Sequence, residues 1–259
     1  KFDNSAPTLQ IVTIASDNTN SSYAMEGDKI ILDITANEDI PEPVVSMMGS
    51  TGDVDIDEGL TSKIYQAEKE VTTSHDEETA EFSIVFTDLA GNSGVTIAAV
   101  TAGPGVTIDM TAPTITKADI ASNNGDGTRP ELAVPGDIIT LTVVSNENIQ
   151  EPTITIMTIP VDVDEGVDAK NWAATYTMTE SDVEGDVEFT ISFSDNAGNL
   201  LVGTSGVEGE PWTTIFNDDD DSDVDFSTAE PELTSVVFES DNIAHPNYAN
   251  TKSLLKLSF

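Results

Sequence analysis

The sequence predicts an all-β protein built from tandem copies of one module, and two observations support this. The stretch Phe-Thr-Asp-Leu-Ala-Gly-Asn at 86–92 recurs as Phe-Ser-Asp-Asn-Ala-Gly-Asn at 193–199. Each copy closes a run in which apolar and polar residues alternate, the period of a half-buried strand. The apolar positions are Phe82, Ile84 and Phe86 in the first run, and Val187, Phe189, Ile191 and Phe193 in the second.

The repeat distance sets the domain organisation, because self-similarity at a fixed period overrides a domain count made from length. We predict one module over 1–108, a second over 109–216, and an acidic joint with an incomplete third module over 217–259. The chain has no Cys. Modules of roughly 100 residues bury enough apolar surface to fold without disulfides.

The charge balance excludes whole classes of partner. With 48 acidic and 9 basic residues the net charge is −39, which repels phosphate backbones and anionic lipid headgroups. Nucleic acid is therefore excluded, while cations, basic proteins and neutral glycans remain. No apolar run of about 18 residues occurs, so we expect no membrane contact in this segment. The chain starts at Lys1 without Met and stops at Phe259 inside a predicted strand, and we expect it to be part of a longer protein.

Each module opens on a stiff, extended segment, because Pro fixes its own φ and holds the preceding Ala extended. These segments are Ala6-Pro7-Thr8 and Ala112-Pro113-Thr114. The predicted first strands follow at 9–14 and 115–120, and a polar loop at 16–27 or 122–136 leads into the second strands at 28–36 and 137–144. Both second strands end in Asn-Glu, at 37–38 and 146–147.

The later strands follow the same order in both modules. We predict strands at 44–48 and 153–159, then at 63–71 and 172–178, and closing strands at 95–100, 105–108, 200–202 and 212–216. Tyr65 falls opposite Trp172 in this register. We favour core packing for these aromatics over a ligand platform, since aromatic side chains dominate protein cores.

The acidic stretch 217–226 occupies the place of Asp109 to Thr111 one module earlier. It is interpreted as a solvated, self-repelling linker or, alternatively, as an enlarged cation site. Pro231 then restarts the pattern, and Leu255 and Leu257 fall where Ile139 and Leu141 fell. Two strands alone do not fold stably, so further chain or a neighbouring molecule must complete the third module.

Taken in order, several motifs resemble the tandem bacterial immunoglobulin-like (Big-type) repeats of large extracellular surface proteins and adhesins. They are Asp-x-x-Ala-Pro-Thr at the opening, Gly-Asp before the second strand, Asn-Glu after it, and Phe-x-Asp-x-Ala-Gly-Asn late in the module. The resemblance implies tandem immunoglobulin-like Greek-key β-sandwiches in an extended array, export to the cell surface, and calcium at the joints in many relatives. The acidic stretch 217–226, and Lys252 in place of Gly27 and Gly136, depart from the pattern.

Catalysis is not predicted for this segment. The two histidines, His75 and His245, have no second His or Cys at metal-ligand spacing, and no nucleophile elbow, P-loop or dinucleotide fingerprint occurs. A glycosidase needs only two carboxylates, but here the acidic residues gather at strand ends and joints rather than in one insertion that builds a pocket.

The most specific expectation is a structural Ca²⁺ at each module opening. In a sandwich of this kind the opening segment and the loops after the second and sixth strands meet at one pole. We therefore predict oxygen ligands from Asp3, Glu38, Asp88 and Asn92 in module one, and from Asp109, Glu147, Asp195 and Asn199 in module two. The loop 16–27 is expected near the second site. Alternatively, Asp88 and Asp195 only cap their own turns through backbone N–H groups.

We therefore expect a non-enzymatic extracellular structural or adhesive repeat segment, such as a spacer, stalk or surface filament. Its expected partners are neighbouring modules of the same chain, further copies in a filament or surface layer, and a glycan or protein receptor at a distal tip. Two alternatives stay open. They are a glycan-binding module and an accessory segment of a secreted hydrolase.

Overall fold

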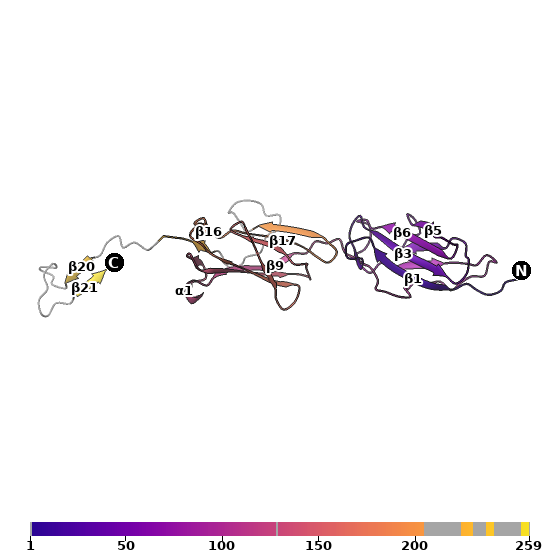
Figure 1. The fold of residues 1–259 in the computed structure, drawn as a ribbon, viewed down its shortest axis with the longest axis horizontal. Helices are drawn as coiled ribbons and strands as arrows, with labels where there is room; N and C mark the ends of the chain where they lie inside the picture. The colour runs from indigo at the N-terminus through magenta and orange to yellow at the C-terminus, as the bar shows by residue number, and fades with distance from the viewer. Residues whose placement is uncertain (1, 128, 205–223, 230–236, 241–254, 259) are drawn as a thin grey trace.

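The computed structural model describes residues 2–127, 129–204, 224–229, 237–240 and 255–258. Within them it is almost entirely β-structure, and Figure 1 shows two strand-built modules end to end. The predicted all-β tandem array is confirmed. Among the described residues no helix is long and apolar enough to cross a membrane.

Module one is a two-layer sandwich. Its larger sheet has the order β1-β3-β6-β5, and its smaller sheet pairs β4 with β7. A parallel pair, β2 with β8, closes one end. The strands are β1 Leu9–Ser16, β2 Tyr23–Ala24, β3 Lys29–Ala36, β4 Val44–Met47, β5 Asp55–Glu58, β6 Ile64–Glu70, β7 Phe82–Val85 and β8 Thr107–Ile108.

Module two repeats this arrangement with more complete strands. One sheet has the order β14-β15-β11-β9, the other β13-β12-β17-β18, and a small third sheet joins β10, β19 and β16. The elements are β9 Ile115–Ser122, α1 Asn124–Gly127, β10 Leu132–Ala133, β11 Ile138–Ser145, β12 Thr153–Ile156, β13 Ile159–Val161, β14 Val163–Glu165, β15 Asn171–Thr177, β16 Gly185–Asp186, β17 Phe189–Ser194, β18 Leu200–Thr204 and β19 Asp225–Phe226.

The strand order identifies the fold. In module two the two sheets read D-E-B-A and C′-C-F-G, and module one follows the same scheme with A-B-E-D opposite C-F. This is the ABED/CFG division of immunoglobulin sandwiches. A further described pair, β20 Val237–Ser240 with β21 Leu255–Ser258, is antiparallel.

Each module has its own core, and the predicted register is correct. Tyr65 is 3% and Trp172 6% exposed, and they face Ile34 on β3 and Val143 on β11, which are equivalent positions. The Tyr65 hydroxyl donates to the Ile40 carbonyl over 2.8 Å, and the Trp172 indole N–H to the Ala169 carbonyl over 3.1 Å. Core packing of these aromatics is therefore confirmed, because a one-residue slip would have turned both outward.

Two element predictions are wrong. Residues 95–100 form no strand, since the chain meets β7 there only through the bridge between Ile97 and Ile84, and Thr101 then bonds to Val12 of β1. In addition, Val224 and Phe226 are 1% exposed and belong to the core of module two, where β19 pairs with β10. This part of 217–226 is thus not a joint; it closes module two as Thr107–Ile108 closes module one. The closing strand predicted at 212–216 lies outside the described residues.

The residues equivalent to the start of the first joint lie later in the chain than predicted. The backbone N–H of Ser227 donates to the Ala133 carbonyl as that of Asp109 donates to the Ala24 carbonyl. Ser227, rather than the aspartate run before it, therefore stands in the place of Asp109. The run 217–223 lies outside the described residues.

Candidate metal centre and module joint

The repeated Asp-x-Ala-Gly-Asn motif forms the same tight turn in both modules. Asp88 Oδ1 accepts the backbone N–H groups of Ala90 and Asn92, each at 2.8 Å. Gly91 has φ +89°, a conformation that favours glycine. The turn-capping role considered for the aspartates is thus present in the structure.

The second turn is capped more fully. Asp195 Oδ1 accepts the backbone N–H groups of Ala197, Gly198 and Asn199 at 2.8, 2.8 and 3.0 Å, and Gly198 has φ +97°. Asp195 is 1% exposed. A buried carboxylate with this many donors holds the turn in one geometry.

Asn199 joins this turn to the opening segment of its module. Its Nδ2 donates to Asp195 Oδ2 over 2.9 Å and to the Asp109 carbonyl over 3.0 Å. In module one, Asn92 makes the same pair of bonds, to Asp88 Oδ2 over 2.6 Å and to the Asp3 carbonyl over 3.3 Å. Both asparagines therefore position carboxylates through nitrogen, and the ligand role predicted for their oxygens stays a prediction.

The glutamates are placed by their neighbours at the end of the second strand. Asn37 Oδ1 accepts the N–H of Thr8 over 2.8 Å, and Asn146 Oδ1 accepts that of Thr114 over 2.7 Å. These bonds tie the loop to the opening segment just after its Pro. The side chain of the next residue, Glu38 or Glu147, then reaches the aspartates.

The outcome is a carboxylate triad at each opening. One oxygen from each of Asp3, Glu38 and Asp88 lies within 4.8 Å of the other two, and the same holds for Asp109, Glu147 and Asp195. In each triad the turn aspartate is buried and the other two residues are half-buried. The structure thus brings together all six predicted carboxylates, three to a module.

The second triad is electrostatically strained. Burial raises the pKa of the Asp109 carboxyl, and the nearby charge of Asp195 raises it further. Burial also raises the pKa of Glu147, followed by repulsion from Asp109 and Asp195. The pKa of Asp88, in contrast, is lowered, chiefly by the hydrogen bond from the Asn92 side chain. A cation between the carboxylates would relieve the repulsion.

The donor chemistry fits calcium. The triads offer only oxygen, without the nitrogen or sulfur ligands that zinc prefers, and Ca²⁺ accepts carboxylates, backbone carbonyls and water in a loose shell. Three carboxylates supply part of such a shell, and water would have to complete it.

Residues of module one contact the turn of module two directly. Asn18 Nδ2 donates to the Ala197 carbonyl over 2.8 Å, and Asn20 Nδ2 to the Asn196 carbonyl over 3.4 Å. The 16–27 loop therefore reaches the joint as predicted, although its described contacts are with the turn rather than the triad. Asn18 is itself fixed by Asp28 Oδ2 at 2.6 Å. Ala197 is fully buried, whereas Ala90 at the equivalent place in module one is exposed.

Sequence reasoning missed a pair of glutamates that hold the chain as it leaves each module. Glu77 Oε1 accepts the N–H of Met110 over 2.9 Å and the hydroxyl of Thr111 over 2.8 Å. Glu184 Oε1 accepts the N–H of Thr228 over 2.8 Å and also its hydroxyl. We call Glu77 and Glu184 the exit glutamates. They precede Phe82 and Phe189 by equal numbers of residues, which is the signal that could have revealed them.

No protein-family model and no curated protein sequence matches the chain. Among solved structures it is similar to the I9-I11 tandem from titin, with 13% identity, a TM-score of 0.30 and coverage of 74% of this chain; the chain spans 64% of that tandem. It is also similar to Rst D1-D2, with 10% identity, a TM-score of 0.37 and coverage of 77% of this chain and 97% of the other.

A marsupial T cell receptor is similar over 78% of this chain and 99% of its own, with 6% identity and a TM-score of 0.26. At TM-scores below 0.5 these likenesses carry no argument about this protein. Its assignment as a tandem of immunoglobulin-like sandwiches rests on its own strand order and repeated register.

Proposed function

We propose that this chain is a non-enzymatic extracellular repeat segment that acts as a spacer, stalk or surface filament, with joints stiffened by calcium. The observation that carries the proposal is the equivalence of the two openings. Each places the same triad, the same asparagine bridge and the same capped turn where one module begins. Chemistry repeated at joints suits a mechanical role better than a reaction, which needs one unique site.

Direct contacts support the mechanical role. The chain is tied on both sides of Pro113, by the exit glutamate Glu77 before it and by the bond from Thr114 to Asn146 after it. Asn18 and Asn20 also join module one directly to the turn of module two. Proline restricts the backbone between these ties. An array of such joints transmits force or spans distance without long flexible linkers.

Calcium would restrict the remaining motion of the opening segment relative to module two. Bound to Asp109, Glu147 and Asp195, an ion would link the opening segment to two loops of module two. We expect an affinity on the order of 10⁻⁴ to 10⁻³ M, as in other extracellular modules. Such a site would be filled outside a cell and empty in cytosol, which accords with the proposed extracellular location.

The test is calorimetric melting and small-angle scattering of the intact chain, in calcium and in EDTA. We expect calcium to raise the melting temperature and to narrow the spread of scattering-derived lengths. Glu147→Gln removes one ligand charge and should weaken both responses. Glu151→Gln changes an exposed glutamate nearby in sequence and should leave both as they are. Equal melting and equal length in calcium and EDTA would refute calcium stiffening.

A further inference from the structure

The joint between the modules has two halves, and each half occurs a second time in the chain. One half is the 16–27 loop of module one, whose Asn18 side chain donates to the turn at 195–199 of module two. The turn is the other half. The second copies are the 122–136 loop of module two and the 88–92 turn of module one. We call the two loops the joint loops.

The joint loops are built alike. Each begins with a serine whose hydroxyl accepts the backbone N–H two residues later. In each, the asparagine that makes this bond also donates from its side chain to an aspartate before the next long strand. Asn18 Nδ2 donates to Asp28 Oδ2 over 2.6 Å, and Asn124 Nδ2 donates to Asp137 Oδ2 over 2.7 Å. Asn124 is therefore held in the same way as Asn18.

The side chain of Asn124 keeps a donor that Asn18 uses across the joint. A carboxamide nitrogen has two N–H groups. Asn18 gives one to Asp28 and the other to the Ala197 carbonyl of module two. Asn124 gives one to Asp137, and none of the described residues accepts the other. Figure 1 shows α1, which begins at Asn124, at the end of module two that faces away from module one.

The turn of module one lacks the cover that its counterpart has. Ala197 is fully buried, and a Cβ placed on Gly198 would lie 3.8 Å from the Met25 sulfur of module one. Ala90, in contrast, is exposed, and a Cβ placed on Gly91 would meet no atom within 4 Å. The Ala90 carbonyl accepts no hydrogen bond from the described residues. The acceptor side of the joint is thus present here without its donor.

Both outer ends expose an apolar side chain at this contact. Leu89 in the uncovered turn is 76% exposed. Val134 of the second joint loop is 43% exposed. It stands in the place of Met25, because the N–H groups of the two residues donate alike to Asp137 Oδ2 and Asp28 Oδ2. A partner that covered these ends would remove both side chains from water, as the joint does for Met25.

Charge distinguishes the second joint loop from the first. The 122–136 loop carries Arg129, the only arginine in the chain, whereas the 16–27 loop has no basic residue. Arg129 is exposed, and its N–H donates to the Asn124 carbonyl over 3.4 Å. None of the described carboxylates forms an ion pair with it. The uncovered turn lies in the carboxylate triad of module one, through Asp88, and guanidinium groups match carboxylates well.

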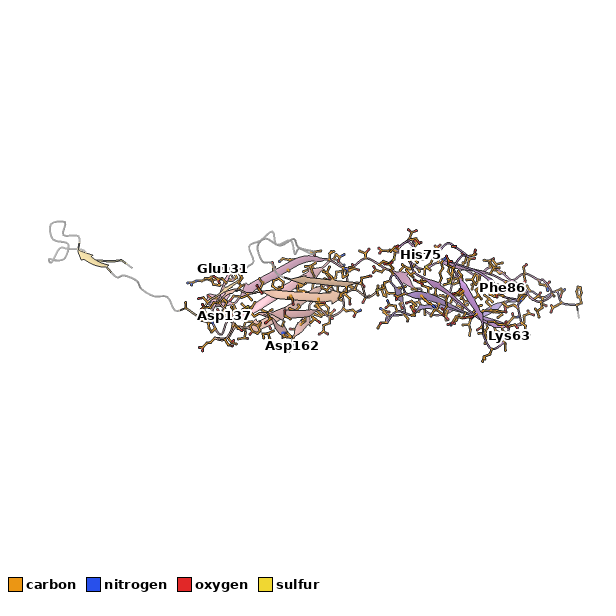
Figure 2. All side chains as sticks on the ribbon, turned by 90° about the horizontal axis from the view of Figure 1, so that it is seen from above. Lys63, His75, Phe86, Glu131, Asp137 and Asp162 are labelled. Atoms are coloured by element: carbon orange, nitrogen blue, oxygen red, sulfur yellow. The ribbon has the colours of Figure 1, made fainter. Side chains whose placement is uncertain are left out.

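The two surfaces lie at opposite ends of the molecule. Figure 2 labels Asp137, which holds Asn124, at the outer end of module two, and Phe86, just before the uncovered turn, toward the outer end of module one. They therefore meet only between copies of the chain. Contact between two different surfaces leaves one of each open, so it repeats into a filament unless the rotation closes a ring.

We propose that a second copy of this chain docks head to tail on the first, with the 122–136 loop of one copy on the 88–92 turn of the other. Asn124 would donate to a turn carbonyl, Arg129 would pair with the triad beside the turn, and Val134 would pack on the turn. The existing joint between the modules is the template for this contact. The inference rests on the filament form of the proposed function and names the contact that builds it.

The experiment is chemical cross-linking of intact chains, which is site-specific because the natural sequence has no Cys. Chains with Ala90→Cys are mixed with chains with Val134→Cys and a short bismaleimide, in EDTA and about 0.15 M salt, where repulsion beyond about 8 Å is screened. Mass spectrometry measures the linked peptides. We expect at least about fivefold more 90–134 product than 90–167 product from Val167→Cys, because docking raises the local concentration only of the first pair.

Val167→Cys is a demanding control. Val167 is 92% exposed, so random collision would link it more readily than Val134. It lies at the other end of module two, three residues before Lys170, whose Nζ donates to the Asn146 carbonyl beside the opening segment. A preference for position 134 over position 167 therefore reports docking rather than accessibility.

Two variants of the Val134→Cys chain test the contacts. Arg129→Gln removes an exposed charge and should lower the 90–134 yield severalfold, and Asn124→Ala should lower it as well. Lys117→Gln removes an exposed lysine of the same module and should change nothing. The proposal is overturned if the 90–134 product does not exceed the 90–167 product, if 90–90 or 134–134 links predominate, or if Arg129→Gln leaves the yield unchanged.

This outcome is separate from that of the calcium test, because every sample contains EDTA. Calcium-dependent melting without a 90–134 product would overturn head-to-tail docking and leave a stiffened stalk. A 90–134 product without calcium-dependent melting would support docking and refute the calcium joints.

Discussion

The exits of the two modules share one set of hydrogen bonds, but the residue that begins the exit turn is Asp109 in one and Ser227 in the other. At both exits a glutamate holds the backbone just past the last strand, Glu77 on Met110 and Glu184 on Thr228. At both, a side-chain oxygen accepts the backbone N–H of the residue two positions later. Asp109 Oδ1 accepts that of Thr111, and Ser227 Oγ accepts that of Ala229. The first exit thus has a carboxylate where the second has a hydroxyl.

This difference separates two functions of one position. A hydroxyl can replace the carboxylate in the local turn, because both accept a backbone N–H. It cannot replace the carboxylate in a triad, because it carries no charge with which to bind a cation. The turn and the hydrogen bond from the exit glutamate are therefore common to both exits, whereas the full triad described at Asp109 requires the aspartate.

The largest effect is expected from removing the buried turn carboxylates. Asp195→Ala leaves three turn N–H groups without their acceptor in a turn covered by module one, and should cost about 3 kcal/mol of unfolding free energy in chelator. Asp88→Ala should cost less, because Ala90 is exposed and water can replace the carboxylate. Calorimetry measures both. Tryptophan fluorescence assigns the module-two transition, since both tryptophans, Trp172 and Trp212, follow Asp109. Equal losses of unfolding free energy in the two variants would contradict the inference that contact with module one makes the second turn depend more on its carboxylate.

The second prediction concerns the substitution that gives the first joint the serine found at the second. Asp109→Ser should keep the turn but abolish the stabilisation by calcium at this joint, about 2.7 kcal/mol when the ion is at a hundredfold its dissociation constant. Isothermal titration with calcium should show one site fewer than in the natural chain. Ser227→Ala serves as the control, because it lies outside both triads. An unchanged number of sites in Asp109→Ser would show that the triad is not the binding site.

A smaller, symmetric effect is expected from the exit glutamates. Glu77→Gln and Glu184→Gln each weaken a charge-assisted hydrogen bond, so the amides of Met110 and Thr228 should exchange with solvent severalfold faster. Calcium binding at Asp109 should persist in both variants. Glu78→Gln, beside Glu77 but without this contact, is the matched control. Unaltered exchange at both amides would mean that the exit glutamates do not restrict the backbone at the joints.

The smallest effect is a pH dependence with opposite signs at the two triads. Asp109 and Glu147 have raised pKa values in the folded chain, so without calcium the strain they cause is present at neutral pH and relieved as the pH falls through those values. Asp88 has a lowered pKa, so its stabilisation is present above its ordinary pKa and lost as the pH falls through the folded value.

In chelator, the melting temperature of module two should therefore rise slightly on mild acidification, before the loss at Asp88 affects module one at lower pH. Calorimetry from pH 7 down to 3 checks this. Calcium should remove the rise, since the ion already relieves the repulsion. A melting temperature of module two that falls steadily from pH 7 in chelator would contradict the strain inferred at Asp109 and Glu147.

Much of the architecture follows from local pattern. Alternation at Phe82, Ile84 and Phe86 specifies a half-buried strand, and Asp followed by Ala-Gly-Asn specifies a turn, because each depends on residues close in sequence. The same locality fixed the core positions of Tyr65 and Trp172. The six carboxylates were found because they sit at strand ends of a repeated fold, where topology alone brings loops to one pole.

What the local pattern could not decide are contacts between residues far apart in sequence. Val224 and Phe226 are read from the sequence as part of an acidic stretch, yet packing against β10 and β16 makes them the last strand of module two. Only the structure shows that the amide nitrogen of Asn199 bridges Asp195 and the Asp109 carbonyl. Lys69 is an ordinary charged residue in the sequence, but in the structure it is buried and its amine donates to the Met47 carbonyl, because only the tertiary fold determines which groups lie within its reach.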